Sequence, residues 1–159
     1  MQESGSVEKE VVEAVGKETS AHTDIDVIKR TAGGDESNDL LRDEVENLLT
    51  SNRIDDALEL LESSHLNDSI WYYLVLSEAY LVKENYPLAI GAADAALILD
   101  PHSAEAYYQR AQARVGIEEY SEAVADITRF IALTTDPELE SHARVLQTRW
   151  REIQTHGLE

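Results

Sequence analysis

The chain has 159 residues, a formal net charge of −19 at pH 7 and no cysteine. The length suits a single domain of ordinary size, and the missing cysteines exclude disulfides, thiol chemistry and thiolate metal sites. The negative charge disfavours binding to nucleic acid or to anionic membranes, which requires lysine and arginine, and it favours basic partners.

Residues 1–36 are predicted to form a disordered acidic tail. They hold nine acidic and four basic residues and no Phe, Trp or Tyr, which leaves too little apolar surface to offset the loss of chain entropy on folding. Two apolar groups interrupt this segment: Val7, Val11, Val12 and Val15 at helical spacing, and the cluster Ile25, Val27 and Ile28. They indicate either a transient helix without a partner or a linear motif that folds on a partner or back onto the domain.

Residues 38–69 are predicted to form a pair of helices joined at Ser51–Arg53. The apolar residues of the pair follow helical spacing: Leu41, Val45, Leu48 and Leu49, then Ile54, Ala57, Leu58, Leu60 and Leu61. Asp55 and Asp56 fall in the first turn of the second helix, where the helix dipole favours acidic residues. Asp68 or Ser69 is the expected cap of the helix that begins near Ile70.

Residues 70–103 are predicted to form a second helix pair, with a clearer pattern. Two apolar stripes mark it: Tyr73, Leu76, Ser77 and Tyr80, then Ala89, Ile90, Ala93, Ala96 and Leu97. Pro87 suits the first turn of the second helix, because the N–H that proline lacks would be unpaired there. Asp100 and Pro101 end the pair.

Residues 104–136 repeat this pattern, with Tyr107 in the place of Tyr73 and Ala123 in the place of Ala89. Ala57 takes the corresponding place in the first pair, which is a degenerate copy and two residues short. After Pro137, one longer helix is expected up to about His156. Its apolar face carries Leu139, Ala143, Leu146, Trp150 and Ile153.

The repeated unit resembles the tetratricopeptide repeat, whose pattern is W-x2-L-G-x2-Y…A-x3-F…P over about 34 residues. The two full copies read Tyr73-x2-Leu76-Ser77-x2-Tyr80…Ala89-x3-Ala93…Pro101 and Tyr107-x2-Arg110-Ala111-x2-Arg114…Ala123-x3-Ile127, the second with a late proline at Pro137. Small residues at Ala89 and Ala123 fit helices that approach closely.

The resemblance implies an all-α fold, a right-handed α–α superhelix of three helix hairpins over residues 38–156. The hairpins would be residues 38–69, 70–103 and 104–136, and residues 137–156 would cap the last apolar surface. Trp150 is therefore expected in the core.

The resemblance also implies a binding groove lined by the first helix of each hairpin. The implied groove residues are Arg42, Glu46, Leu49, Trp71, Leu74, Glu78, Leu81, Glu105, Tyr108 and Gln112. Trp71 lies one position off the packing stripe, so it is either an exposed binding anchor or packed against the second helix of the first hairpin.

One subfamily of these domains binds the acidic C-terminal tails of heat-shock chaperones with two lysines, two asparagines and an arginine. The corresponding positions here hold Arg42, Glu46, Val75, Glu105 and Gln109, and only Arg42 could serve. Because Glu46 and Glu105 would repel a carboxylate, the expected partner is a basic and apolar segment.

These features predict a non-enzymatic adaptor that is a monomer when free and binds a peptide or helix of a partner protein. The alternatives are a structural subunit of a larger assembly and a co-chaperone-type adaptor with a different binding mode. The five histidines are scattered and no glycine-rich phosphate loop occurs, so no catalytic residue, metal or cofactor is expected. With neither a leader pattern after Met1 nor an apolar run long enough to cross a bilayer, a cytoplasmic or nuclear protein without membrane insertion is expected.

Overall fold

The structure is a computed structural model that describes residues 35–64 and 66–157. These residues form seven α-helices, and no strand occurs within those ranges, so the expected all-α class is confirmed. The acidic tail expected at the N-terminus falls almost entirely outside the described residues. None of the helices in the described ranges combines the length and the hydropathy that a membrane span needs.

The chain divides into two compact units, Met1–Asn47 and Leu48–Glu159. The described part of the first unit is most of α3 (Asp35–Thr50), which begins before the expected Asn38 and buries Leu41 and Val45. The last turn of α3 belongs to the second unit.

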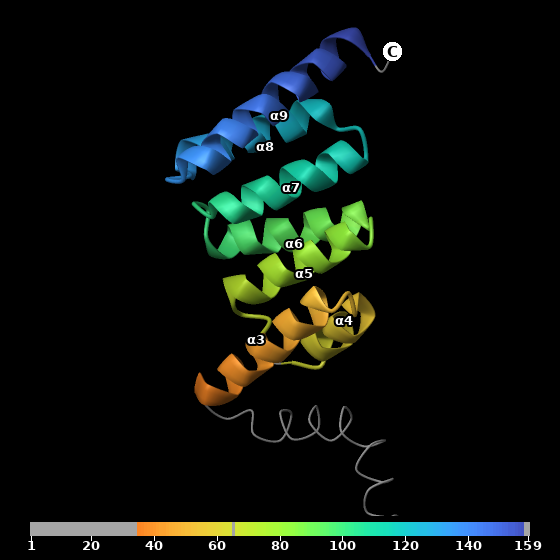
Figure 1. Ribbon diagram of the computed structural model, residues 1–159, viewed down its shortest axis with the longest axis vertical. Coiled ribbons are helices and arrows are strands. Elements are labelled where there is room, and N and C mark those ends of the chain that lie inside the picture. The colour runs from red at the N-terminus through yellow and green to blue at the C-terminus, as the bar shows by residue number, and fades with distance from the viewer. Residues whose placement is uncertain (1–34, 65, 158–159) are drawn as a thin grey trace, which may run out of the picture. The chain divides into compact units, whose positions relative to one another are not determined.

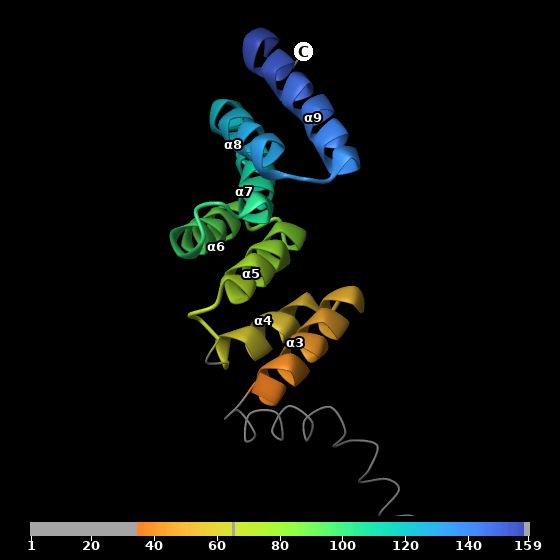
Figure 2. The ribbon, with the colours of Figure 1, turned by 90° about the vertical axis from the view of Figure 1, so that its left-hand side faces the viewer.

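The second unit continues with α4 (Ile54–Glu62), α5 (Ile70–Val82), α6 (Tyr86–Leu99), α7 (Ala104–Gly116), α8 (Tyr120–Leu133) and α9 (Pro137–His156). From α5 to α9, each helix packs against the next in a stack (Figure 1). In Figure 2, α6 and α8 lie to the left of α5 and α9, while α7 packs against α5, α6 and α8. This stacking of helix hairpins is the arrangement of an α-solenoid.

The turns inside the three hairpins close in the same way. Each has one non-glycine residue with positive φ: Asn52 at 58°, Glu84 at 56° and Glu118 at 63°. The next N–H in each turn reaches back five residues: Arg53 N to Leu48 O (2.8 Å), Asn85 N to Tyr80 O (2.9 Å) and Glu119 N to Arg114 O (2.8 Å). This bond belongs to the Schellman closure of a helix C-terminus, and its recurrence shows that the degenerate first copy uses the same turn.

The local signals in the sequence mark the helix ends correctly. The hydroxyl of Ser69 accepts a hydrogen bond of 3.2 Å from the N–H of Tyr72, so it is the cap expected before α5. Pro87 lies in the first turn of α6, and Asp100 follows its last residue. Pro137 begins α9 after a cap by Asp136. The late proline suggests a longer connection, but the α8–α9 connection (134–136) is one residue shorter than the α6–α7 connection (100–103).

Small residues let the paired helices approach closely. Ala89 and Ala123 are fully buried, as expected for the tight contact in each hairpin. In α5, the buried hydroxyl of Ser77 donates a hydrogen bond of 3.1 Å to the carbonyl of Ala89 in α6. Trp150 is 6% exposed and belongs to a cluster with Ala123, Ile127, Phe130 and others, which confirms its core position.

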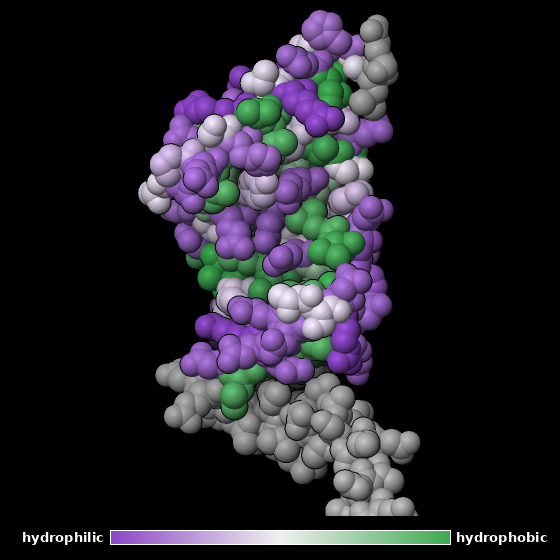
Figure 3. All heavy atoms as spheres, in the orientation of Figure 1, coloured by the Kyte–Doolittle hydropathy of each residue, from purple (hydrophilic) through white to green (hydrophobic). Residues whose placement is uncertain are grey.

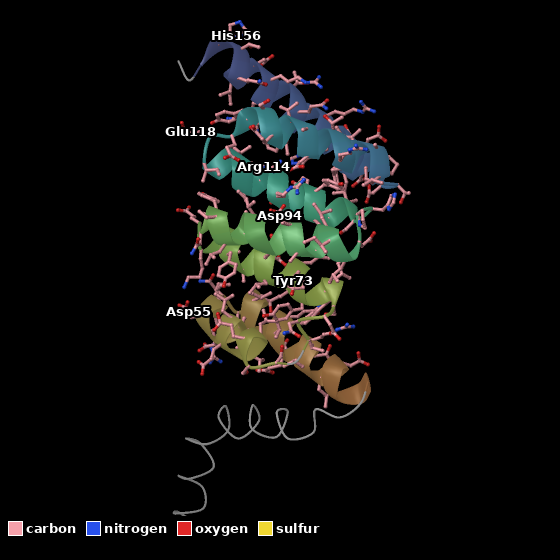
Figure 4. All side chains as sticks on the ribbon, turned by 180° about the vertical axis from the view of Figure 1, so that it is seen from behind. Asp55, Tyr73, Asp94, Arg114, Glu118 and His156 are labelled. Carbon is pink, nitrogen blue, oxygen red and sulfur yellow. The ribbon has the colours of Figure 1, made fainter. Side chains whose placement is uncertain are left out.

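A charged network joins α6, α7 and α8, and the sequence reasoning did not anticipate it. The Asp126 carboxylate, 3% exposed by residue, accepts two hydrogen bonds from Arg110 (2.6 and 2.9 Å) and one from Arg114 (2.8 Å). Arg110 also donates to Asp94 of α6 at 2.6 Å. The bonds to Asp126, together with the one to Asp94, outweigh burial and raise the pKa of Arg110. Asp94 and Arg114 are labelled in Figure 4.

Candidate functional site

The structure places the predicted binding residues of α5 and α7 on two adjacent helix stripes. Trp71, Leu74, Glu78 and Leu81 recur at intervals of three or four on α5, as do Glu105, Tyr108 and Gln112 on α7. The two helices are in contact. Other sides of them face α6 and α8, through Ser77 on α5 and Ala111 on α7.

These two stripes mix charged and apolar side chains. Glu78 and Glu105 are exposed, whereas Trp71, Leu74 and Tyr108 are half-buried. Trp71 was expected either as an exposed binding anchor or as packed against the second helix of the first hairpin, and its half-burial lies between these two alternatives. Part of the Tyr108 ring serves the core, because its centroid lies 4.9 Å from that of Phe130. In Figure 3, hydrophobic side chains lie among hydrophilic ones over these helices.

The two carboxylates lie close enough to interact. Desolvation by burial, and then the negative charge of Glu78, raise the pKa of the Glu105 carboxyl. Each helix thus brings an acidic group to the same place, and a positively charged ligand would relieve their repulsion.

The remaining predicted residues lie on α3. Arg42 is half-buried and Glu46 is exposed in the first unit, and Leu49 is half-buried at the start of the second. Their membership in one groove with α5 and α7 stays a prediction.

Helix α9 repeats the register of α7, and two cross-helix bonds demonstrate this. Arg110 of α7 bonds to Asp94 of α6, and Gln147 of α9 donates to Thr128 of α8 at 2.7 Å. Asp94 and Thr128 are equivalent positions of the repeat, so Gln147 takes the place of Arg110. It lies three residues further along the chain than the repeat alone would put it. The α8–α9 connection (134–136) is not longer than the α6–α7 connection (100–103), so α9 begins about one turn earlier relative to this register than α7 does.

The same alignment of Arg110 with Gln147 maps buried Ala106 onto buried Ala143. Helix α9 therefore occupies the position of the first helix of a fourth hairpin.

This register extends the candidate site onto α9. It maps Glu105, Tyr108 and Gln112 onto the exposed His142, Val145 and Arg149. Val145 is 65% exposed, and it lines with Arg149 an open hollow of about 500 Å³. We call the residues named on α5, α7 and α9 the α5–α7–α9 face.

The sequence reasoning missed the α9 part of this face because it treated the helix only as a cap. Aligning the alternating small and large positions of α7 with those of α9 could have found it. Within the described ranges, Arg149 forms no ion pair, so this end of the face is basic and the middle is acidic.

Comparisons with known proteins agree with this architecture. Residues 76–147 match the family model described as Tetratricopeptide repeat. No curated protein matches the sequence significantly.

Several solved structures share the fold at low sequence identity. The Arabidopsis OM64 TPR domain is 20% identical with a TM-score of 0.66, covering 74% of this chain and 96% of its own. The Yersinia enterocolitica secretion chaperone SycD, in complex with a peptide of the translocator YopD, is 15% identical with a TM-score of 0.69, covering 78% and 99%. The first TPR of Spaghetti (RPAP3), bound to the HSP90 peptide SRMEEVD, is 18% identical with a TM-score of 0.60, covering 69% and 90%.

The repeated hairpin turns, the buried alanines at equivalent positions of the repeat and the family match lead to one conclusion. Residues 76–147 match the tetratricopeptide repeat family, and the chain has the all-α helical-repeat fold of solved TPR domains.

Proposed function

We propose that this protein is a non-enzymatic adaptor that binds a segment of a partner protein on the α5–α7–α9 face. The observation that carries the proposal is the pair Glu78 and Glu105, exposed beside the half-buried Trp71, Leu74 and Tyr108. Half-buried aromatic side chains suit binding anchors, because they offer apolar area at low entropic cost.

The partner segment combines lysine or arginine with large apolar residues. Basic residues match the two carboxylates in the middle of the face and the strongly negative chain as a whole. Charge attraction speeds the encounter and weakens with salt, while the apolar anchors set the dissociation rate.

The related structures support the binding of a peptide as such. The proposed composition of that peptide rests on the charges of this chain. SycD and Spaghetti were each solved with a peptide of another protein. An acidic peptide such as SRMEEVD fits this chain poorly: Glu105 is exposed where the chaperone-binding subfamily has a lysine, and Val75 and Gln109 are buried. A co-chaperone role would need a different binding mode.

One observation favours the second candidate, a structural subunit that docks permanently into an assembly. Helix α6 exposes three large apolar residues: Leu88 at 48%, Ile98 at 81% and Leu99 at 47%. Exposed apolar side chains can contribute to lasting protein contacts when they join into one patch. The adaptor would therefore bind through α5, α7 and α9, and the structural subunit would dock through α6.

The experiment compares two double variants of the full chain in partner capture from the source cells. Trp71→Ala/Leu74→Ala alters α5, and Leu88→Ala/Ile98→Ala alters α6. The adaptor predicts loss of the captured partner with the α5 variant alone. Loss with the α6 variant alone would establish the subunit instead.

Titration with synthetic peptides tests the partner chemistry. SRMEEVD and a version with lysine in place of its acidic residues are followed by tryptophan fluorescence across a salt series. The basic peptide should bind, and more weakly as salt rises. Tighter binding of SRMEEVD would contradict the proposed polarity.

A further inference from the structure

Helix α6 turns to solvent a side made of apolar and small residues. Six residues form this side, which we call the α6 stripe: Pro87, Leu88, Gly91, Ala95, Ile98 and Leu99. At the helical spacing they fall within about one third of the circumference. Ala95 is half-buried and the other five are exposed, Ile98 by 81%. The charged residue of α6, Asp94, borders the stripe and is already bonded to Arg110.

The equivalent helices of the other two hairpins have no such stripe. On α8, the exposed Glu122 and Arg129 take the places of Leu88 and Ala95. The exposed acidic residues of α4 are Asp55, Glu59 and Glu62. Packing inside the solenoid therefore does not require an apolar outer side, and α6 is the hairpin helix that departs from the solvated pattern.

Gly91 lies in the middle of the stripe, and the chain itself does not need glycine there. Its φ is not positive, and a Cβ atom added to it would lie in open space, with nothing beyond the adjacent helix backbone within 4 Å. Glycine is among the poorest helix formers. A residue without a side chain is useful at this place if another backbone approaches α6 from outside.

The order of residues along the stripe is symmetric about the level of Ala93. The large Leu88 and Ile98 lie equally far from this level on either side, and so do the small Gly91 and Ala95. Two antiparallel copies of α6 would set Leu88 of each against Ile98 of the other, and Gly91 against Ala95. Such reciprocal contacts are what a twofold interface between identical chains requires. A different protein would not need this symmetry.

We propose that the α6 stripe is the interface of a homodimer, in which two copies of α6 pack antiparallel around a twofold axis. Large side chains meet at both ends of the contact, and the small residues let the backbones cross closely at its centre. One helix crossing is a small interface, so the dimer is weak and reversible. The monomer expected from the sequence is then its dissociated form.

Charge opposes this dimer. Each chain carries a formal charge of −19, and the stripe offers no opposite charge to a second copy. Because salt screens the repulsion, the dimer strengthens as salt rises, whereas the proposed binding of a basic segment weakens. The stripe belongs to α6, which lies to the left of α5 and α9 in Figure 2. The dimer therefore does not use the α5–α7–α9 face or depend on the adaptor function.

Sedimentation velocity of the full chain over series of protein and salt concentrations tests the dimer. The native chain should pass from monomer to dimer, and at lower concentration in higher salt. Ile98→Glu should raise the dissociation constant at least about a hundredfold, because each dimer would bury two new charges. Leu139→Glu changes a similarly exposed apolar residue of α9 and should leave the constant unchanged. A native chain that stays monomeric, or a dimer that Ile98→Glu leaves intact, would overturn the proposal.

Introduced cysteines test the antiparallel register without background, because the chain has no cysteine of its own. Leu88→Cys and Ile98→Cys chains are oxidised separately and as a mixture. The mixture should give a disulfide-linked dimer, and each variant alone should give little. Equal yields from either variant alone would show a parallel or unspecific contact and would refute the proposed pairing.

Gly91→Gln separates the dimer from the fold, because its two expected effects have opposite signs. Glutamine forms helices better than glycine and has open space here, so the dilute chain should unfold at a higher temperature. The dissociation constant should nevertheless rise about tenfold or more, because the side chain holds the two backbones apart. An unchanged constant would contradict the close crossing at Gly91.

Partner capture gives one further check. A native chain that is monomeric, and that loses its captured partner with Leu88→Ala/Ile98→Ala alone, would assign the α6 stripe to another protein and overturn the homodimer.

Discussion

The second and third hairpins share one backbone register but support it with different chemistry. In the second hairpin, these positions hold the half-buried Leu76 and Tyr80 of α5 and the buried Ala92 of α6. The equivalent residues of the third hairpin are Arg110, Arg114 and Asp126, which form the charged network. The repeat therefore fixes which positions meet, and it leaves open whether they meet as apolar or as charged groups.

The apolar residues can be exchanged for the charged ones only if all three positions change together. Asp126 accepts hydrogen bonds from both arginines, although the buried Nε of Arg114 has no hydrogen-bond partner. Arg110 additionally stacks on Tyr107, with 5.5 Å between its guanidinium carbon and the ring centroid. One arginine or one aspartate in the apolar hairpin would be an uncompensated buried charge. The comparison predicts that single changes in the network are costly and that the complete exchange is tolerated.

The largest effect is expected from Asp126→Ala, which removes the shared acceptor and leaves two arginines, each with a side chain 20% exposed or less, without it. The loss should be about 3–5 kcal/mol, as for other broken buried ion pairs. Urea unfolding followed by circular dichroism measures it. A loss near zero would mean that the network contributes nothing to the third hairpin.

The triple variant Arg110→Leu/Arg114→Tyr/Asp126→Ala gives the third hairpin the residues of the second. Replacing a complete buried ion network by apolar residues is commonly neutral or stabilising. The triple variant should therefore recover the stability lost by Asp126→Ala, while Asp94, whose side chain is 48% exposed, stays hydrated. Failure to recover would show that the two hairpins differ in backbone as well as in side chains.

A smaller effect is expected where the two hairpins are alike. Ala89→Leu and Ala123→Leu each overfill a fully buried position between paired helices, which should cost about 1–3 kcal/mol. Thermal unfolding measures both, with the exposed Ala125→Leu on α8 as the control. Clearly unequal losses would show that the charged hairpin is packed less tightly than the apolar one.

The turns should respond to glycine in the opposite direction. Glu84 and Glu118 have positive φ, a conformation that costs most residues about 1 kcal/mol and glycine almost nothing. Glu84→Gly and Glu118→Gly should therefore raise the free energy of unfolding by up to about 1 kcal/mol. Asn52→Gly should gain less, because asparagine tolerates this conformation. A loss of stability in both glutamate variants would indicate that their side chains stabilise the turn.

The smallest effect concerns pH. The pKa of Glu105 is raised from 4.5 in the folded chain by burial and by Glu78, so the folded state binds this proton more tightly than the unfolded state. Ionised Glu105 therefore reduces stability as pH rises through its folded pKa, and the penalty is absent below the unfolded value. Glu105→Gln should be more stable than the native chain at neutral pH and equal to it below about pH 4.

Urea unfolding at several pH values checks this, with Glu118→Gln as the matched control. A Glu105→Gln variant that loses stability at neutral pH would show that the carboxylate is stabilised in the fold rather than strained.

The local parts of the architecture were accessible from the sequence. The cap at Ser69, the turn before Pro87 and the small residues Ala89 and Ala123 follow from periodicity and turn chemistry, which involve residues close together in the chain. The candidate residues Trp71, Leu74, Glu78, Glu105 and Tyr108 followed from the resemblance to the tetratricopeptide repeat. Whether they bind a partner stays a proposal.

The sequence by itself determined the helices, their ends and the repeat, because each depends on spacing along one short segment. Only the tertiary structure decided which chemistry fills the repeated positions, as when Arg110 reaches both Asp94 and Asp126. It also decided that α9 takes up the register of α7 and that the amide of Gln109 lies against Glu105 with its oxygen unpaired. Those facts depend on where α9 begins relative to the repeat and on side chains from neighbouring helices, which local patterns do not encode.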